Sequence, residues 1–180
     1  MKRSSSHFNS SKGITAVELL IAVAILAVLG GAAMPSFLNL LQQYRFNAAA
    51  RQIATDVRLA QSLAVSRGLR FRLIAFDRTD GTRPNSYRLE GSNTGTAWPA
   101  VIDTPATNPL VYNDWINLAA QYSGVAITAT DQTIYFDPRG TRVNGAGGDA
   151  SVVTLSNGTG TMSIQVSSVG RVTAVHSVSY

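Results

Sequence analysis

The sequence contains no cysteine, and this absence excludes several kinds of chemistry at once. No disulfide can staple the fold, no thiol can act as a nucleophile, and no cysteine-based metal site can form. Histidine is nearly as scarce, because only His7 and His176 occur. An enzyme needs a nucleophile or an acid and a base in one site, and the sequence shows no such constellation. We therefore expect no enzymatic activity, no catalytic residue, no cofactor and no bound metal.

Lysine is absent beyond Lys12, so all twelve basic residues after Gly13 are arginines. The formal charge of +5 falls to +2 without residues 1–13, since three basic residues leave and no acid leaves with them. The basic character therefore belongs largely to this N-terminal leader. Arginine suits bidentate contacts with carboxylates and phosphates, but a compositional bias of the genome gives the same pattern.

Two polar patterns in the second half of the chain do not complete a ligand site. The glycine-rich stretch 144–149 lacks the Lys-Ser or Lys-Thr pair of a phosphate-binding loop, and it does not stand between a strand and a helix. Asp137 and Asp149 would have to meet to bind calcium, and the oxygen-rich spacing of a calcium loop is missing. We expect the glycine-rich stretch to be a turn.

One long apolar run dominates the N-terminal part. Residues 14–34 contain only two polar side chains, Thr15 and Glu18. As a helix this run is about 31 Å long, close to the roughly 30 Å hydrocarbon thickness of a bilayer, so it can span a membrane. The leader before it is basic and has no acid, which predicts a cytoplasmic N-terminus. The chain after Pro35 is then expected to be periplasmic.

The carboxylate of Glu18 is the unusual feature of this run. A charged side chain in a spanning helix costs on the order of 2 to 3.5 kcal/mol, so a plain membrane anchor would gain by losing it. A cleaved secretory signal has a shorter apolar core and no acid within it. A plain single-pass anchor explains the length of the run, but it explains neither the glycine before it nor Glu18.

The segment resembles the class III signal of type IV pilins and type II secretion pseudopilins. In that family the cut follows a glycine, and here Gly13 precedes Ile14, which makes Glu18 the fifth mature residue. Pro35 becomes the twenty-second mature residue, where many pilins also have proline. The resemblance implies cleavage between Gly13 and Ile14 by a prepilin peptidase that also methylates the Ile14 amine. The segment departs from the family at Ile14, where phenylalanine is usual, and at residues 15–17.

The same resemblance implies a role for Glu18 and a place in the cell. Glu18 would pair with the positively charged N-terminus of a neighbouring subunit, which explains why a costly carboxylate is retained in an apolar run. The protein is expected in the bacterial inner membrane as a single-pass protein. It would then be assembled with other pilins or pseudopilins through the N-terminal helix.

A helical pattern continues after the apolar run, so residues 35–68 are expected to be an amphipathic half of the same helix. Gly68 after Arg67 is a stop signal, and one helix is therefore predicted from Ile14 to Arg67. Gln52 and Asp56 are spaced for an i, i+4 contact among its polar residues. The apolar positions recur every three or four residues, at Phe37, Leu40, Leu41, Tyr44, Ala48, Ile53, Val57, Ala60 and Ala64.

Three residues near the middle of the predicted helix weaken it. Pro35 has no amide to bond the carbonyl of Gly31, and Gly30 and Gly31 each cost roughly 1 kcal/mol in a helix. We expect a kink or a local loss of helix over Gly30, Gly31 and Pro35.

From Leu69 onward the hydrophobic pattern changes to a period of two. The candidate strands cover residues 71–76, 86–90, 126–129, 133–136, 151–155, 162–166 and 171–175. The dipeptides Asp80-Gly81, Asn144-Gly145 and Asn157-Gly158 are turn signals, and residues 91–109 are expected to be a long surface loop. The predicted fold is α+β, with the long N-terminal helix packed against an antiparallel β-rich head of residues 69–180.

Three short motifs of the second half resemble the GspH and FimT/FimU family of minor pilins. They are residues 61–68 (QSLAVSRG), 134–140 (IYFDPRG) and 169–172 (VGRV). The first departs from the family at Leu63, where an acidic residue is common. The resemblance implies a structural subunit near the tip of a filament, and it leaves open whether that filament is a type II secretion pseudopilus or a type IV pilus.

A receptor for DNA uptake is the alternative function. Arg139, Arg142 and Arg171 are the residues that would contact DNA, because the expected strand order brings them to one end of the head. Family members that act in DNA uptake often have a second arginine soon after the last Gly-Arg pair, and Gly170-Arg171 is not followed by one. So few phosphate contacts predict weak, salt-sensitive binding, and a structural role is the preferred interpretation.

Overall fold

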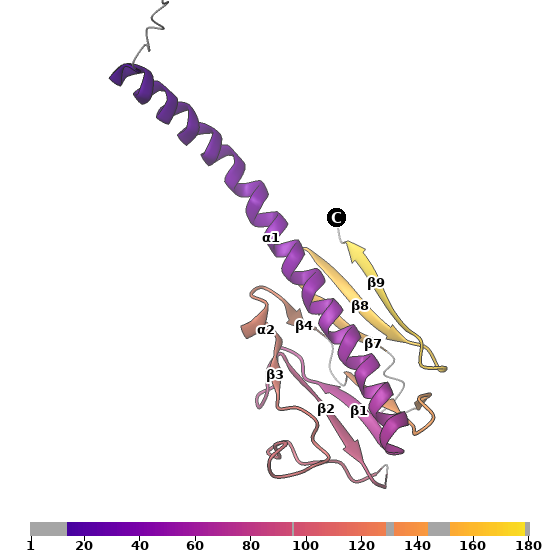
Figure 1. Cartoon of the computed structure of the whole chain (residues 1–180). Coiled ribbons are helices and arrows are strands. Elements are labelled where there is room, and N and C mark those ends of the chain that lie inside the picture. The colour runs from indigo at the N-terminus through magenta and orange to yellow at the C-terminus, as the bar shows by residue number, and fades with distance from the viewer. Residues whose placement is uncertain (1–13, 95, 129–131, 144–151, 179–180) are drawn as a thin grey trace, which may run out of the picture. The chain divides into compact units, whose positions relative to one another are not determined.

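The computed structural model describes residues 14–94, 96–128, 132–143 and 152–178. The chain forms two compact units, Met1–Leu40 and Leu41–Tyr180. One long helix, α1 (Ala16–Arg67), begins in the first unit and ends in the second. The second unit adds two antiparallel sheets and the short helix α2 (Leu118–Gln121) (Figure 1).

The helix α1 has 52 residues, and its ends follow from local chemistry. The Oγ1 atom of Thr15 accepts a hydrogen bond from the Glu18 amide at 3.2 Å, which caps the first turn. At the other end Gly68 has a φ of 63°, a left-handed conformation that ends helices and favours glycine. Helical structure continues through Pro35, so the expected local loss of helix there is wrong. A kink at Gly30, Gly31 and Pro35 remains a prediction.

The first unit contains the apolar half of α1. Every side chain described from Ile14 to Leu40 is exposed, and an 18-residue window of the helix has a mean hydropathy of 2.4. The helix is long and apolar enough to cross a membrane. The described part of this unit buries none of these side chains, so their burial needs an apolar environment that the unit itself does not provide.

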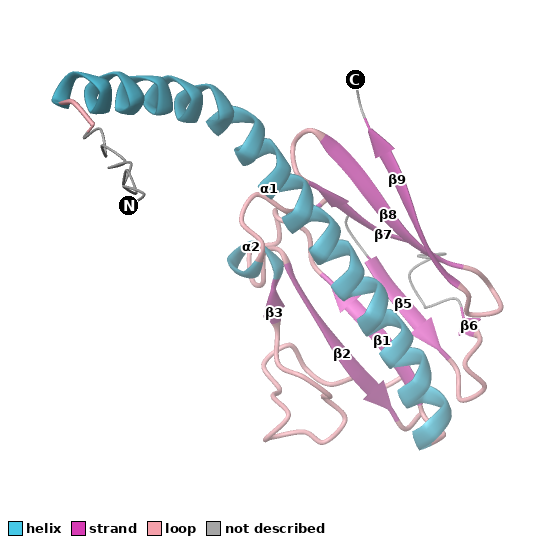
Figure 2. Ribbon diagram, turned by 45° about the horizontal axis from the view of Figure 1, so that its top comes forward, coloured by secondary structure: helices cyan, strands magenta, loops and turns pink. Residues whose placement is uncertain are grey.

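The second unit is built on two antiparallel sheets (Figures 1 and 2). The first has the order β3-β2-β1-β5-β6. Its strands are β1 (Arg70–Ala75), β2 (Ser86–Ser92), β3 (Ile116–Asn117), β5 (Gln132–Phe136) and β6 (Arg142–Val143). The second has the order β4-β7-β8-β9. Its strands are β4 (Ala126–Ile127), β7 (Val152–Ser156), β8 (Gly160–Val166) and β9 (Val172–Val178).

All seven predicted strands correspond to strands of these sheets, and the α+β fold is confirmed. The turn at Asn157-Gly158 joins β7 to β8, with the Asn157 Oδ1 atom accepting the amides of Thr159 and Gly160 at 3.1 and 2.9 Å. The turn signal at Asn144-Gly145 lies outside the described residues. The sequence pattern missed β3, β6 and α2, because elements of two to four residues are too short to show a period.

The core of the second unit lies between α1 and the two sheets. Ile53, Val57, Ala60 and Ala64 were predicted on the apolar face and are buried, whereas Tyr44 is 64% exposed. Burial begins at Phe46, since the sheets cover the helix only from that turn onward. The buried side chains of α1 are Phe46, Ala49, Ala50, Ile53, Ala54, Val57, Ala60 and Ala64.

Two polar residues of α1 bond to tyrosines of the head instead of to each other, one in β2 and one at the end of α2. The Asp56 Oδ2 atom accepts a hydrogen bond from the Tyr87 hydroxyl at 2.6 Å, and the Gln52 Oε1 atom accepts one from the Tyr122 hydroxyl at 2.6 Å. Both helix side chains are half-buried. Burial raises the pKa of the Asp56 carboxyl, and the hydrogen bond from Tyr87 opposes this shift only in part.

A buried cluster of charged residues links β1 and β2. Glu90 is fully buried, and its Oε1 and Oε2 atoms accept hydrogen bonds from the Nε atoms of Arg72 and Arg88, both at 2.6 Å. Arg88 is only 1% exposed. A buried carboxylate between two guanidinium groups is tolerated because its charge is balanced and its oxygens are bonded.

The same arginine holds the long loop after β2 against the sheet. The guanidinium nitrogens of Arg88 donate to the carbonyl oxygens of Ala100 and Asp103 at 2.7 and 2.8 Å. Its guanidinium carbon lies 4.5 Å from the centre of the Trp115 ring. The predicted surface loop is therefore fixed by a strand residue beneath it.

We predict that Asp56→Asn removes one pH dependence of stability. The pKa of Asp56 is higher in the fold than its ordinary value of 3.8, so its protonated form stabilises the fold. That contribution is present below the ordinary value and is lost as pH rises through the folded pKa. The free energy of unfolding of wild type minus that of Asp56→Asn should therefore fall as the pH rises from below 3.8 through the raised pKa of Asp56 in the fold. Chemical unfolding of the full-length proteins in detergent measures this difference in stability at each pH.

Tyr87→Phe is the control for this experiment. It leaves the Asp56 carboxylate half-buried without its hydrogen-bond donor and should cost about 1 to 3 kcal/mol at neutral pH. Parallel stability curves for wild type and Asp56→Asn over the whole pH range would show that the carboxyl has an ordinary pKa.

Candidate assembly sites

The predicted processing site lies at the start of α1. Gly13 is outside the described residues, and Ile14 is 75% exposed. The backbone amide of Glu18 is used by the cap on Thr15, and its side chain is exposed. A carboxylate in the first turn also interacts favourably with the helix dipole. The described structure therefore leaves the Glu18 carboxylate accessible to another chain.

The second family-like motif forms a tight turn between β5 and β6. The Asp137 Oδ1 atom accepts the amides of Arg139 and Thr141, both at 2.9 Å, and the Gly140 amide donates to the Asp137 carbonyl at 2.9 Å. Burial alone would raise the pKa of Asp137, but the hydrogen bonds from Thr141 and Arg139 outweigh it and lower the pKa. Asp137 therefore organises the turn.

The third motif forms the turn between β8 and β9. The Gly170 amide donates to the Ser167 carbonyl at 2.9 Å, and the Arg171 amide donates to the Ser167 Oγ atom at 3.0 Å. Gly170 has a φ of 83°. This turn therefore needs glycine for its backbone conformation.

The two turns meet over α1 at Gln61. The Gln61 Nε2 atom donates to the Gly140 carbonyl at 2.7 Å, and the Arg142 amide donates to the Ser168 carbonyl at 3.1 Å. A methyl group on Gly170 would overlap the Gly140 carbonyl oxygen and the Gln61 amide. The three family-like motifs thus converge on one contact between the helix and a turn from each sheet. We call this contact the Gln61 junction.

The junction brings together the three arginines proposed for DNA contact. Arg139 and Arg171 are exposed on the two turns, and Arg142 follows in β6. The end of α1 and the start of β1 add Arg67 and Arg70 at the same end, because β1 pairs with β5 so that Phe71 faces Phe136. This end of the head is basic.

The described residues contain no cluster of three or more metal-ligating side chains. The suggested pairing of Asp137 with Asp149 for calcium involves a residue outside the described part of the chain, while Asp137 bonds its own turn.

Comparison with known proteins identifies the family. Residues 49–170 match the sequence profile of the family described as "Type II transport protein GspH". This segment contains the first two motifs of the Gln61 junction and the first two residues of the third, and it covers more than half of the chain. The protein therefore belongs to the GspH family, a family of minor pseudopilins and pilins. Such proteins are structural subunits.

Two solved structures resemble this chain. The type IV minor pilin FimU of Pseudomonas aeruginosa has 14% identity and a TM-score of 0.47, over 72% of this chain and 91% of that chain. The minor pseudopilin EpsH from the type 2 secretion system of Vibrio cholerae has 11% identity and a TM-score of 0.43, over 72% of this chain and 95% of that chain. Comparison with curated protein sequences gives no match.

We predict that Gly170→Ala destabilises the head more than Gly158→Ala. Both glycines have φ values near 85°, so either alanine meets a backbone cost of about 1 to 2 kcal/mol. The added methyl group has open space at Gly158, but at Gly170 it collides with backbone and with Gln61. Overpacking should add about 1 to 3 kcal/mol to the loss at Gly170. Thermal and chemical unfolding of the full-length variants measures the difference. Equal losses of stability would mean that the β5–β6 and β8–β9 turns do not pack closely at Gly170.

Proposed function

We propose that the protein is a minor pilin or pseudopilin that is matured between Gly13 and Ile14, methylated on the Ile14 amine and assembled near the tip of a filament. The observation that carries this proposal is the combination of a GspH-family head with an apolar run that begins directly after Gly13 and has Glu18 as its fifth residue. The filament is a type II secretion pseudopilus or a type IV pilus.

In this proposal the protein resides in the membrane before it is assembled into the filament. Residues 1–13 are the cleaved leader, residues 14–34 span the inner membrane, residues 35–68 form the amphipathic half of α1, and residues 69–180 form the periplasmic head. The basic leader supports a cytoplasmic N-terminus. The exposed apolar side chains of α1 support burial first in lipid and then among the helices of other subunits. A kink at Gly30, Gly31 and Pro35 would adjust the direction of the helix at the membrane surface.

The first prediction from this proposal concerns maturation. Protein isolated from its own membranes should begin at Ile14 and carry one added methyl group, because the prepilin peptidase cleaves after Gly13 and methylates the new amine. Intact mass spectrometry distinguishes this species from the full chain. Protein from cells that lack the peptidase is the control and should retain residues 1–13. A chain that still begins at Met1 in cells with an active peptidase would refute the proposal.

The second prediction concerns Glu18. Glu18→Gln should leave the protein in the membrane but reduce its recovery with partner pilins, because a neutral side chain cannot pair with the ammonium group of a neighbouring N-terminus. Thr15→Ala is the matched control, since it removes the helix cap and keeps the carboxylate. Co-purification from sheared filaments and membranes measures both. Equal recovery of Glu18→Gln and wild type would show that the carboxylate has no role in assembly.

A DNA-uptake receptor remains the second candidate, and one observation favours it. Arg139, Arg142 and Arg171 lie at the same end of the head as Arg67 and Arg70, which stand at the end of α1 and the start of β1. Against it, Asp137 lies in the same region and the second arginine after Arg171 is missing. DNA binding that depends on these residues would fall steeply with salt.

A further inference from the structure

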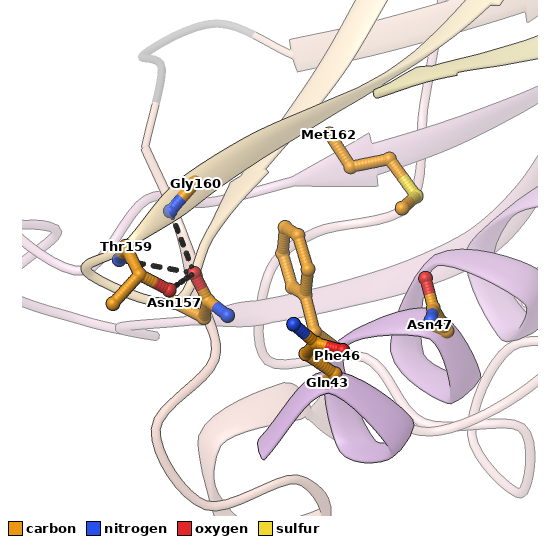
Figure 3. A pocket seen from close by; sticks show the side chains of 7 residues that line it. All are labelled: Gln43, Phe46, Asn47, Asn157, Thr159, Gly160 and Met162. Atoms are coloured by element: carbon orange, nitrogen blue, oxygen red, sulfur yellow. Dashed lines mark hydrogen bonds between the residues drawn. The ribbon is translucent and has the colours of Figure 1, made fainter. Parts of the chain in front are cut away.

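A line of three hollows runs along one side of α1 within the second unit. The first, of about 390 Å³, lies between the start of the buried part of α1 and the β7–β8 turn. Figure 3 shows the Phe46 ring between the helix and the turn at Asn157 and Gly160, with Met162 beyond it. The hollow is lined by backbone and side-chain amides as well as by these two apolar side chains.

Neighbouring hollows share lining residues, so the three follow one another along the same side of α1. The second hollow, of about 440 Å³, shares Asn47 and Met162 with the first. The third, of about 390 Å³, shares Arg58 with the second and extends to Ser66. From Gln43 to Ser66 the groove follows α1 for about 35 Å, the length of about ten residues of extended chain. We call it the α1 groove.

The charged side chains that line the α1 groove are all positive. Arg51 and Arg58 line the second hollow, and Arg58 and Arg139 line the third. No Asp or Glu stands among the described residues that line the three hollows. In the described part of the chain none of these three guanidinium groups takes part in an ion pair. Asp137 interacts electrostatically with Arg139 from the same turn, but its oxygens bond the turn's own amides, so the guanidinium groups of the groove remain available as donors for an anionic ligand.

The floor and walls suit a protein segment better than a nucleic acid. Ala50, Ala54, Ala174 and Met162 give the second hollow an apolar surface next to its arginines. Concave pockets that combine apolar walls with a few polar groups accept side chains, and Arg binds carboxylates in a bidentate manner. Contacts to duplex DNA are made mainly to phosphates and need no apolar hollow. The combination here favours a peptide with carboxylate side chains.

We infer that the α1 groove binds an extended, acidic segment of another protein, with its carboxylates on Arg58 and Arg139 and its apolar side chains in the second hollow. This site is separate from the N-terminal helix contact through Glu18, so it would give the head an attachment of its own. It does not depend on which of the two filaments contains the protein.

The absence of lysine after Lys12 allows a direct test. Arg58→Lys and Arg139→Lys each place one amine in the groove, and a zero-length carbodiimide joins that amine only to a carboxylate in contact with it. Arg78→Lys is the matched control, because Arg78 is exposed and lines none of the three hollows. The full-length variants are expressed in the native host, cross-linked in intact cells, and analysed by mass spectrometry. An amine-reactive label confirms that each introduced lysine is accessible, and wild type, which has no lysine after Lys12, gives the background.

The inference predicts that both groove variants link to Asp or Glu residues within one short segment of a single partner. Replacing those carboxylates by their amides should abolish the product, and Arg58→Glu should lose the complex and regain it when the partner carboxylate is changed to arginine. Four results would overturn the inference. They are no product from an accessible lysine, products no more specific than those of Arg78→Lys, a link to a carboxylate of the same chain, and loss of the product on adding duplex DNA together with DNA binding that Arg58→Glu removes.

Discussion

The fold of the second unit depends on the alanine-rich face of α1. Five of the eight buried residues of this helix are alanines, and they alternate along its length with Ile53 and Val57. Small side chains let strands come close to the helix backbone, so one helix can serve as the common core for two separate sheets. A larger side chain at these positions would push one sheet away from the other.

The Gln61 junction joins the helix and both sheets at one end of the head. The β5–β6 turn belongs to the first sheet and the β8–β9 turn to the second, so the contact of both with Gln61 ties the sheets together through the helix. Gly170 is required there for its positive φ and for the closeness of Gly140. Three motifs that are short and separated in the sequence are therefore parts of one structural feature. Each motif alone is too short to indicate this contact, which forms only when the fold brings the three together.

The sequence predicted the features that repeat and missed those that depend on a single contact. Period-two alternation located seven strands, and the glycine after Arg67 located the end of α1. Gln52 and Asp56 were placed among polar helix residues, but nothing in the periodicity shows that tyrosines from the head bond to them. The cluster of Arg72, Arg88 and Glu90 was missed for a related reason.

That cluster could have been detected only through strand register. Arg72 lies opposite Glu90 in the β1–β2 pair, and Arg88 is two residues before Glu90 on the same face. Charged residues at such positions predict a solvent-exposed face of the sheet unless a loop is known to cover them. The sequence of residues 93–115 has no pattern that predicts a loop packed over this face. The α1 groove could not be predicted from the sequence either, because it depends on tertiary packing. Its second hollow lies where α1 and the edge of the second sheet leave a space between them.

The two units place different demands on one helix. The described core begins at Phe46, so no buried side chain of the head comes from the apolar half of α1. A change at Glu18 is therefore expected to have no direct effect on the packing of the head. On the proposed function, this separation would allow a carboxylate that costs on the order of 2 to 3.5 kcal/mol in lipid to be kept for a contact with another subunit. On the same proposal, the head has its own core and would recognise a partner through the α1 groove, while the helix would attach the protein to the filament.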